Sequence, residues 1–298
     1  MMLKIEPRKN RSNFLEVSAP VIAVFLTMIF GGVLFLSMGK NPFEAIKLIF
    51  WDPIMSPTFS EYSRPQLVIK AAPLILIALG LSFGFRANIW NIGAEGQYIM
   101  GALISGSIGL ALYPLDSMFI FPLMILGGII GGIFWAMIPA ILKIRFNTNE
   151  ILVSLMLVYV AEQILALASV GFLRNPEGLG FPGSRDLSKY PSAANPELIA
   201  NSGMHMGVIF SIIAVIVLTY FLIYHRLGFQ IKLLGQAPKA SKFSGVNSNY
   251  IIIFCLGLSG GLAGVAGMFE LTGPAGLINI DFNVGYGFTA IIVAFLGR

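Results

Sequence analysis

The chain consists largely of apolar runs that are each about as long as a bilayer is thick. A hydrocarbon core of about 30 Å requires about 20 residues of helix, because a helix rises about 1.5 Å per residue. Within lipid every backbone polar group must be bonded internally, so runs of this length fold as helices. The runs lie at residues 19–38, 66–84, 96–113, 117–142, 149–172, 204–224, 250–270 and 284–298. We therefore predict an all-α, polytopic transmembrane helical bundle with about eight spans in a single domain, residues 1–298.

The composition agrees with a membrane protein and disfavours several other classes. Only 11% of the 298 residues are charged, against about 25% in soluble domains. The net charge of +5 arises largely from cations in short loops, which indicates membrane topology rather than nucleic-acid binding. One cysteine, Cys255, and two distant histidines, His205 and His225, form no metal-binding pattern. We expect no cofactor, no metal, no catalytic residue and no nucleic-acid partner.

The distribution of Lys and Arg orients the spans. Short cytoplasmic loops of membrane proteins carry an excess of these residues. With the amino terminus inside, the cytoplasmic segments are 1–18, 85–95, 143–148 and 225–249, and most of their charges are positive. The outer segments mix both signs and lie at 39–65, 114–116, 173–203 and 271–283. We expect a cytoplasmic N-terminal tail at residues 1–18 and a large cytoplasmic loop at residues 225–249.

The last apolar run is shorter than the others. A membrane helix needs about 17–25 residues, and this run begins only near Val284 before the sequence stops at Arg298. We expect the last span to be incomplete, either because the chain is truncated at its C-terminus or because a neighbouring chain completes the fold.

A polar segment with two glycines separates the second and third runs. Residues 86–97 read RANIWNIGAEGQ and place carboxamides, a carboxylate and an indole among apolar neighbours. Polar groups at this depth face a protein interior or an aqueous path, and glycines favour a break in the helix. We predict a broken helix near residues 85–97. The polar side chains of this segment, together with a glutamate from the middle of the fifth run, form the predicted substrate path. The residues are Asn88, Trp90, Asn91, Glu95, Gln97 and Glu162.

Structural roles stay open for several of these residues. Glu95 stands at a helix start, where a carboxylate also stabilises the helix dipole and the free N–H groups. Trp90 suits an interfacial anchor as well as a stacking face for a sugar or nucleobase. Glu162 must be paired or protonated at such a depth, and we place Glu270, at the end of the seventh run, at the outer rim.

The large cytoplasmic loop contains a short helix pattern. Pro238 can open the helix, Lys239–Phe243 provide about a turn and a half, and Gly245 can close it. A short, basic, partly apolar helix can lie on membrane lipid or dock into a groove on a cytoplasmic protein. The residues alone leave both alternatives open.

Motifs of ATP binding and of hydrolysis are absent from the sequence. No segment fits the phosphate-binding pattern G-x-x-x-x-G-K-[ST], so ATP-driven transport requires a separate ATPase chain. An ion-coupled secondary transporter, with Glu95 or Glu162 as a relay, stays an alternative. A membrane-embedded enzyme is disfavoured, because the sequence shows neither a metal cluster nor a nucleophile motif.

Five blocks of sequence carry a resemblance to a known family. They are FRANIWNIGAEGQ (85–97), NEILVSLMLVY (149–159), GFQIKLLGQAPKASKFSG (228–245), LSGGLAGVAGMFE (258–270) and GYGFTAIIVAFLGR (285–298). In this order they are similar to the permease subunits of ABC importers for simple sugars and nucleosides, within the superfamily of branched-chain amino acid and ribose permeases. The NIGAEGQ motif resembles the branch that pairs with nucleoside or sugar receptors.

The resemblance implies an inner-membrane permease of a bacterium that forms half of a translocation path for a nucleoside or sugar. It implies cytoplasmic ABC ATPase subunits, a second permease subunit of the same or a different kind, and an external substrate-binding protein as partners. It also implies a helix that couples the permease to the ATPase, built from Gly235, Pro238, Lys239, Ala240, Ser241 and Gly245. Family members continue beyond the last block with further hydrophobic sequence. Its absence here agrees with the expectation that the last span is incomplete.

Overall fold

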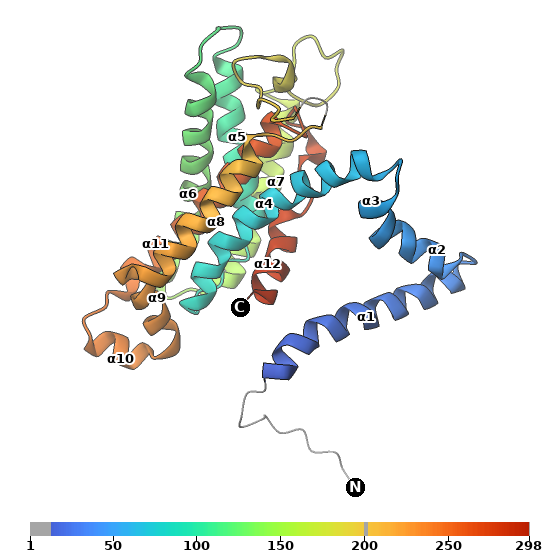
Figure 1. Cartoon of the computed structure of the whole chain (residues 1–298). Helices are drawn as coiled ribbons and strands as arrows, with labels where there is room; N and C mark the ends of the chain where they lie inside the picture. The colour runs from blue at the N-terminus through green and yellow to red at the C-terminus, as the bar shows by residue number, and fades with distance from the viewer. Residues whose placement is uncertain (1–12, 200–201, 298) are drawn as a thin grey trace. The chain divides into compact units, whose positions relative to one another are not determined.

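The computed structural model describes residues 13–199 and 202–297 (Figure 1). Over these residues the chain folds into helices joined by loops, with an isolated β-bridge between Glu197 and His205. The all-α fold that the apolar runs predict is therefore confirmed. Residues 1–12 of the predicted cytoplasmic tail lie outside the described residues.

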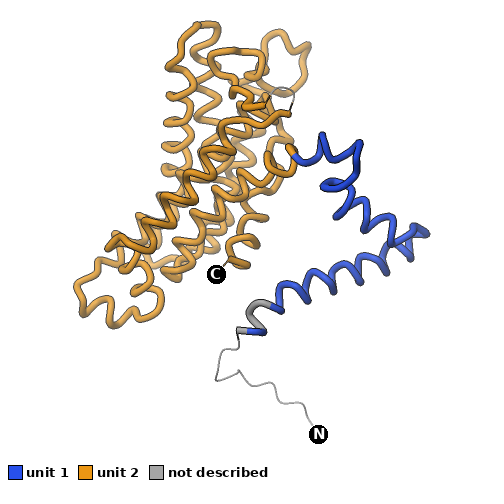
Figure 2. Tube along the Cα trace, viewed as in Figure 1, with its two compact units in different colours: residues 1–64 blue, residues 65–298 orange. Residues whose placement is uncertain are grey.

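The chain divides into two compact units, Met1–Arg64 and Pro65–Arg298 (Figure 2). In the first unit, Asn41 caps a short helix by accepting a hydrogen bond of 3.1 Å from the Phe43 N–H. Most large apolar side chains of the first helix are exposed, as expected for a helix in contact with lipid. The described helices of this unit are α1 (Asn13–Ser37), α2 (Pro42–Ile46), the π-helix η1 (Lys47–Trp51), α3 (Asp52–Met55) and the first turn of α4 (Ser60–Arg86).

The second unit contains the rest of α4 and the helices from α5 to α12. Figure 1 shows the long helices of this unit running side by side as a bundle. Their bounds are α5 (Ala94–Ala111), α6 (Ile120–Phe146), α7 (Glu150–Val170), α8 (Met206–Tyr224), α9 (Arg226–Gln236), α10 (Pro238–Phe243), α11 (Ser248–Thr272) and α12 (Tyr286–Leu296). Two short 3₁₀ turns, η2 (Leu187–Lys189) and η3 (Ile280–Phe282), lie in the loops.

Six of the described helices are long and apolar enough to cross a membrane. They are α1 from Ser18 onwards, α4, α6, α7, α8 and α11. The third predicted span is α5, which has 18 residues but carries Glu95 and Gln97 in its first turn. The last predicted span is α12, which has 11 residues. Each predicted span therefore coincides with a helix.

Glycines allow α5, α6 and α11 to pack with their backbones in contact. A Cβ atom added to Gly132 of α6 would collide with the carbonyl oxygen of Gly260 on α11, and one added to Gly264 with that of Gly128. A Cβ atom added to Gly101 of α5 would likewise collide with backbone atoms of Gly264. Small residues permit such close approach where hydrophobicity cannot drive helix association. These three helices therefore form the centre against which the rest of the second unit packs.

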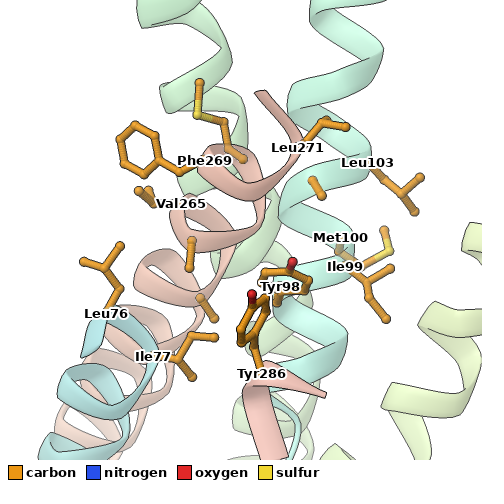
Figure 3. Close-up of a cluster of buried hydrophobic side chains, with 14 of the residues drawn as sticks. Leu76, Ile77, Tyr98, Ile99, Met100, Leu103, Val265, Phe269, Leu271 and Tyr286 are labelled. Atoms are coloured by element: carbon orange, nitrogen blue, oxygen red, sulfur yellow. The ribbon is translucent and has the colours of Figure 1, made fainter. Parts of the chain in front are cut away.

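Apolar side chains of α4, α5, α11 and α12 fill the space between these helices (Figure 3). Leu76 of α4 and Val265 of α11 are each 1% exposed. Tyr98 of α5 and Tyr286 of α12 lie next to each other in this cluster, with ring centroids 5.8 Å apart. The cluster attaches α12 to the centre of the bundle.

Gly264→Ala will destabilise the protein, because the new methyl group overlaps backbone atoms of α6 that cannot rotate away. Overpacking of this kind costs about 1–3 kcal/mol, so we expect a lower Tm of the purified protein in detergent. Gly257 is the matched control on the same helix, because a Cβ there meets only the flexible end of Met137, at 3.2 Å. Equal Tm values for Gly264→Ala and Gly257→Ala would contradict the backbone contact.

Candidate functional site

The break predicted near residues 85–97 is the segment of residues 87–93 between α4 and α5. Asn88 takes a left-handed conformation with a φ of 58°, which asparagine tolerates better than most residues. The Ile89 N–H donates to the Gly84 carbonyl over 2.8 Å. The chain therefore turns tightly as soon as α4 ends.

Asn91 and Gln97 pair their side-chain amides inside the protein. Asn91 Nδ2 donates to Gln97 Oε1 over 2.8 Å, and Gln97 Nε2 donates back to Asn91 Oδ1 over 3.1 Å. Asn91 Nδ2 also reaches Ser259 Oγ on α11 over 2.9 Å, and its Oδ1 accepts the Gly93 N–H over 3.0 Å. Both amide residues are 1% exposed. This network ties the break to α5 and α11.

Glu95 caps the start of α12. Its Oε1 accepts the Gly285 N–H over 3.0 Å, and its Oε2 accepts the Gly287 N–H. The residue is completely buried. A carboxylate at a helix N-terminus satisfies free N–H groups and interacts favourably with the helix dipole. Because Glu95 itself lies in the first turn of α5, one carboxylate stands at the starts of two helices.

Glu162 lies on α7 beside the loop that leads into α12. Its Oε1 accepts a hydrogen bond of 2.6 Å from Asn283 Nδ2. Asn283 precedes Gly285, whose N–H is held by Glu95. The structure therefore brings two of the predicted path residues, Glu95 and Glu162, to one end of α12.

Trp90 packs its indole against aromatic neighbours. Its ring centroid lies 4.9 Å from that of Phe85 and 5.2 Å from that of Phe295. The indole Nε1–H donates to Asn88 Oδ1 over 3.2 Å, and the backbone N–H of Trp90 reaches Glu150 Oε1 over 3.5 Å. Trp90 and Asn88 thus form a third group of path residues that bond each other.

A charged pair inside the bundle is absent from the set of residues predicted from sequence. Lys70 Nζ on α4 lies 3.4 Å from Glu270 Oε1 on α11 and 5.6 Å from the centroid of the Tyr286 ring on α12. Glu270 is buried, at 5% exposure, rather than lying at an exposed rim. Among the described residues, the buried Tyr98 hydroxyl has no hydrogen-bond partner, whereas the Tyr286 side chain interacts with both Lys70 and Glu270.

This pair had a signal in the sequence. Lys70 is a lysine within the apolar run 66–84, and ionisable residues within membrane spans mark either functional sites or internal pairs. In the structure the pair joins α4 to α11, and its lysine side chain is still 53% exposed.

The predicted coupling residues lie on α9, on α10 and at the end of α10. Ser241 is completely buried, whereas the ring of Phe243, which is not among the predicted coupling residues, is 94% exposed. Gly245 follows α10 with a φ of 72°, a conformation that favours glycine. The exposed members of the predicted set are Pro238, Lys239, Ala240 and Gly245.

Gly235 connects this loop to the break. A Cβ atom on Gly235 would collide with the carbonyl oxygen of Arg86, the last residue of α4, and lie 3.1 Å from the carbonyl carbon of Ala87. Ile231, on the same helix as Gly235, is completely buried in a cluster with Phe83 and Ala87. The predicted coupling loop is therefore in direct backbone contact with the point at which the break begins.

Comparison with known protein families identifies the chain. The model of the family described as branched-chain amino acid transport system / permease component matches residues 64–298. The chain belongs to this family. The membership that the five sequence blocks predict is thereby confirmed.

The relatives of this permease are membrane subunits of ABC transporters. A glucose ABC transporter permease protein of Haloferax volcanii is 30% identical over 99% of this chain and 78% of its own length. A nucleoside ABC transporter permease protein of Lactococcus lactis subsp. cremoris is 27% identical over 95% of this chain and 78% of its own length. A guanosine ABC transporter permease protein of Bacillus subtilis is 26% identical over 93% of this chain and 78% of its own length. No solved structure matches the chain.

The chain is thus a multi-pass membrane permease of the ABC transporter class, a transport subunit rather than an enzyme. In this class ATP hydrolysis takes place in a separate chain. The predicted contacts of the six path residues with substrate stay a prediction, and the structure adds that each of these residues bonds or packs against its neighbours.

Glu95→Gln will destabilise the permease, because a glutamine offers one acceptor oxygen to two backbone N–H groups and turns its NH₂ toward one of them. A buried donor left without an acceptor costs about 1–3 kcal/mol, so we expect a lower Tm in detergent. Glu162→Gln is the matched control, since its side-chain oxygen can still accept from Asn283. An unchanged Tm for Glu95→Gln would mean that the carboxylate does not hold α12.

Lys70→Met alone will destabilise the permease more than Lys70→Met combined with Glu270→Met. The single change leaves the buried carboxylate without its partner, whereas the double change removes both charges. We expect a loss of about 1–3 kcal/mol for the single change, below the range of a fully buried pair, because the Lys70 side chain is 53% exposed. Tm values of both single variants and the double variant complete the cycle. A loss in the double variant equal to the sum of the two single losses would show that the two charges do not stabilise each other.

Proposed function

We propose that this permease is the membrane subunit of an ATP-driven importer for nucleosides or simple sugars and forms half of the translocation path. Support comes from the relatives, whose names specify glucose, nucleoside and guanosine transport. A second source of support is the set of polar side chains within the bundle, because neutral, hydroxyl-bearing solutes are recognised by a few well-placed polar groups among apolar ones.

The complete importer contains cytoplasmic ABC ATPase subunits, a second permease subunit and an external substrate-binding protein. The permease lies in the inner membrane of a bacterium with its N-terminus in the cytoplasm. The concentration of Lys and Arg in segments 85–95, 143–148 and 225–249 supports this orientation. With this orientation, α9 and α10 face the ATPase subunits.

The backbone contact between α9 and the break carries this proposal. The exposed ring of Phe243 on α10 is a side chain that a groove on the ATPase can bury. Movement of α10 then displaces α9, and Gly235 transmits the displacement to Arg86 because their backbones touch. Arg86 is the residue before the break, so the force arrives where the membrane helix is interrupted.

The predicted path residues transmit the movement further into the bundle. The amides of Asn91 and Gln97 join the break to α5 and α11, and Glu95 joins α5 to α12. We assign these three residues a positioning role in alternating access, in which the break and α12 move together. Lys70, half-exposed beside Glu270, provides a polar group to the same path.

Uptake of radiolabelled guanosine and glucose tests the proposed function directly. Cells that contain the gene are compared with cells that lack it, with ATP either depleted or maintained while an uncoupler is present. We expect uptake to stop on ATP depletion and to persist with the uncoupler. The reverse pattern would identify an ion-coupled carrier and would replace the proposed function.

Phe243→Asp will lower uptake about tenfold or more, because a charged side chain cannot be buried in an apolar groove on the ATPase. Uptake rates and co-purification of the ATPase subunits with the permease measure the effect. Phe181→Asp is the matched control, since Phe181 is also largely exposed, at 75%, but lies in the segment between α7 and α8. Equal uptake by both variants, at equal membrane levels, would exclude α10 as the docking helix.

A further inference from the structure

A cavity of about 380 Å³ lies among α4, α8, α9 and α12. Its walls are mostly aliphatic, with Leu79, Leu222 and Val293 among the lining residues. Two hydroxyl-bearing side chains, Ser82 and Thr219, interrupt the apolar lining. The cavity shares no lining residue with the amide network or with the charged pair described above.

Arg86 and Lys232 give this cavity two positive charges, and no Asp or Glu of the described residues lines it. Arg86 is the last residue of α4, and Lys232 lies on α9 shortly after the spanning helix α8. Within the described part of the chain, neither cation forms an ion pair. Arg86 is partly buried and Lys232 is exposed, so both uncompensated charges are accessible to an anion. The cavity therefore favours an occupant that is negatively charged at one end and apolar along the rest.

We propose that this cavity binds an anionic phospholipid, with the phosphate-bearing headgroup facing Arg86 and Lys232 and an acyl chain along the aliphatic wall. Basic pockets at the cytoplasmic ends of spanning helices are suited to such headgroups. A neutral nucleoside or sugar leaves both charges uncompensated, and a free phosphate leaves the aliphatic wall uncovered. The orientation proposed above places this lipid in the inner leaflet.

Native mass spectrometry of the full chain in a nonionic detergent tests this site. The probes are a phosphatidylglycerol, a phosphatidylcholine with the same acyl chains, and inorganic phosphate. We expect one phosphatidylglycerol to be retained in preference to phosphatidylcholine, and inorganic phosphate not to displace it. In the double variant Arg86→Gln with Lys232→Gln, we expect affinity for phosphatidylglycerol to fall about 25-fold, about fivefold for each cation removed.

Arg145→Gln with Arg226→Gln is the matched control. Arg145 lies near the end of the spanning helix α6, as Arg86 lies at the end of α4, and Arg226 lies on α9, as Lys232 does. Neither Arg145 nor Arg226 lines the cavity. The control should bind phosphatidylglycerol as the unmodified protein does. Val293→Trp provides a second test, because it fills the aliphatic side with both cations intact and should also abolish lipid retention, even if the charge variant fails to fold.

Three results would overturn the proposal. They are equal retention of phosphatidylcholine and phosphatidylglycerol, full displacement of the lipid by inorganic phosphate, and undiminished binding by Val293→Trp. None of these results depends on transport, so the lipid site can fail while the proposed importer function stands, and the reverse also holds.

Discussion

The carboxylate of Glu95 is the group on which the arrangement of the interrupted helices depends. A helix that begins inside a membrane protein has free N–H groups that neither lipid nor apolar side chains can satisfy. From the first turn of α5, Glu95 accepts two such groups at the start of α12. Because Gly287 has no side chain, the backbone of Glu95 packs directly against it. This contact also sets the distance between α5 and α12. Glu95 thus holds the first turn of α12 against the first turn of α5.

The same principle explains why the amides beside Glu95 are buried. Asn91 lies in the break, where the backbone is not helical and its polar groups need side-chain partners. Its amide meets one such need within the break and also bonds Gln97 and Ser259. The helix is interrupted here, but hydrogen bonds hold the interrupting segment in place. These contacts support the proposed transmission of a displacement from Gly235 and Arg86 to α5 and α11.

The sequence predicted the helices well, because lipid leaves long apolar runs no alternative to helix. It also located the break, since glycines and carboxamides in residues 87–93 interrupt the apolar pattern. It could not predict the partner of Glu95, because the Gly285 N–H lies 190 residues away and any residue type except proline could provide such a donor. Lys70 was missed for a different reason: one lysine hardly changes the hydropathy of a span of 27 residues, and its partner Glu270 lies on another helix.

Two of the three cations of α4, Lys70 and Arg86, differ in what compensates their charge. Lys70 has Glu270, and this pair is part of the packing of α4 against α11. Arg86 instead opens onto a cavity that it shares with Lys232 and that is lined by no carboxylate of the part of the chain described by the structure. Because the carbonyl of Arg86 also touches Gly235, any anion bound by its side chain would stiffen the contact through which α9 reaches the break. An anionic headgroup at this position would therefore link the composition of the membrane to the coupling between the ATPase subunits and the transport path.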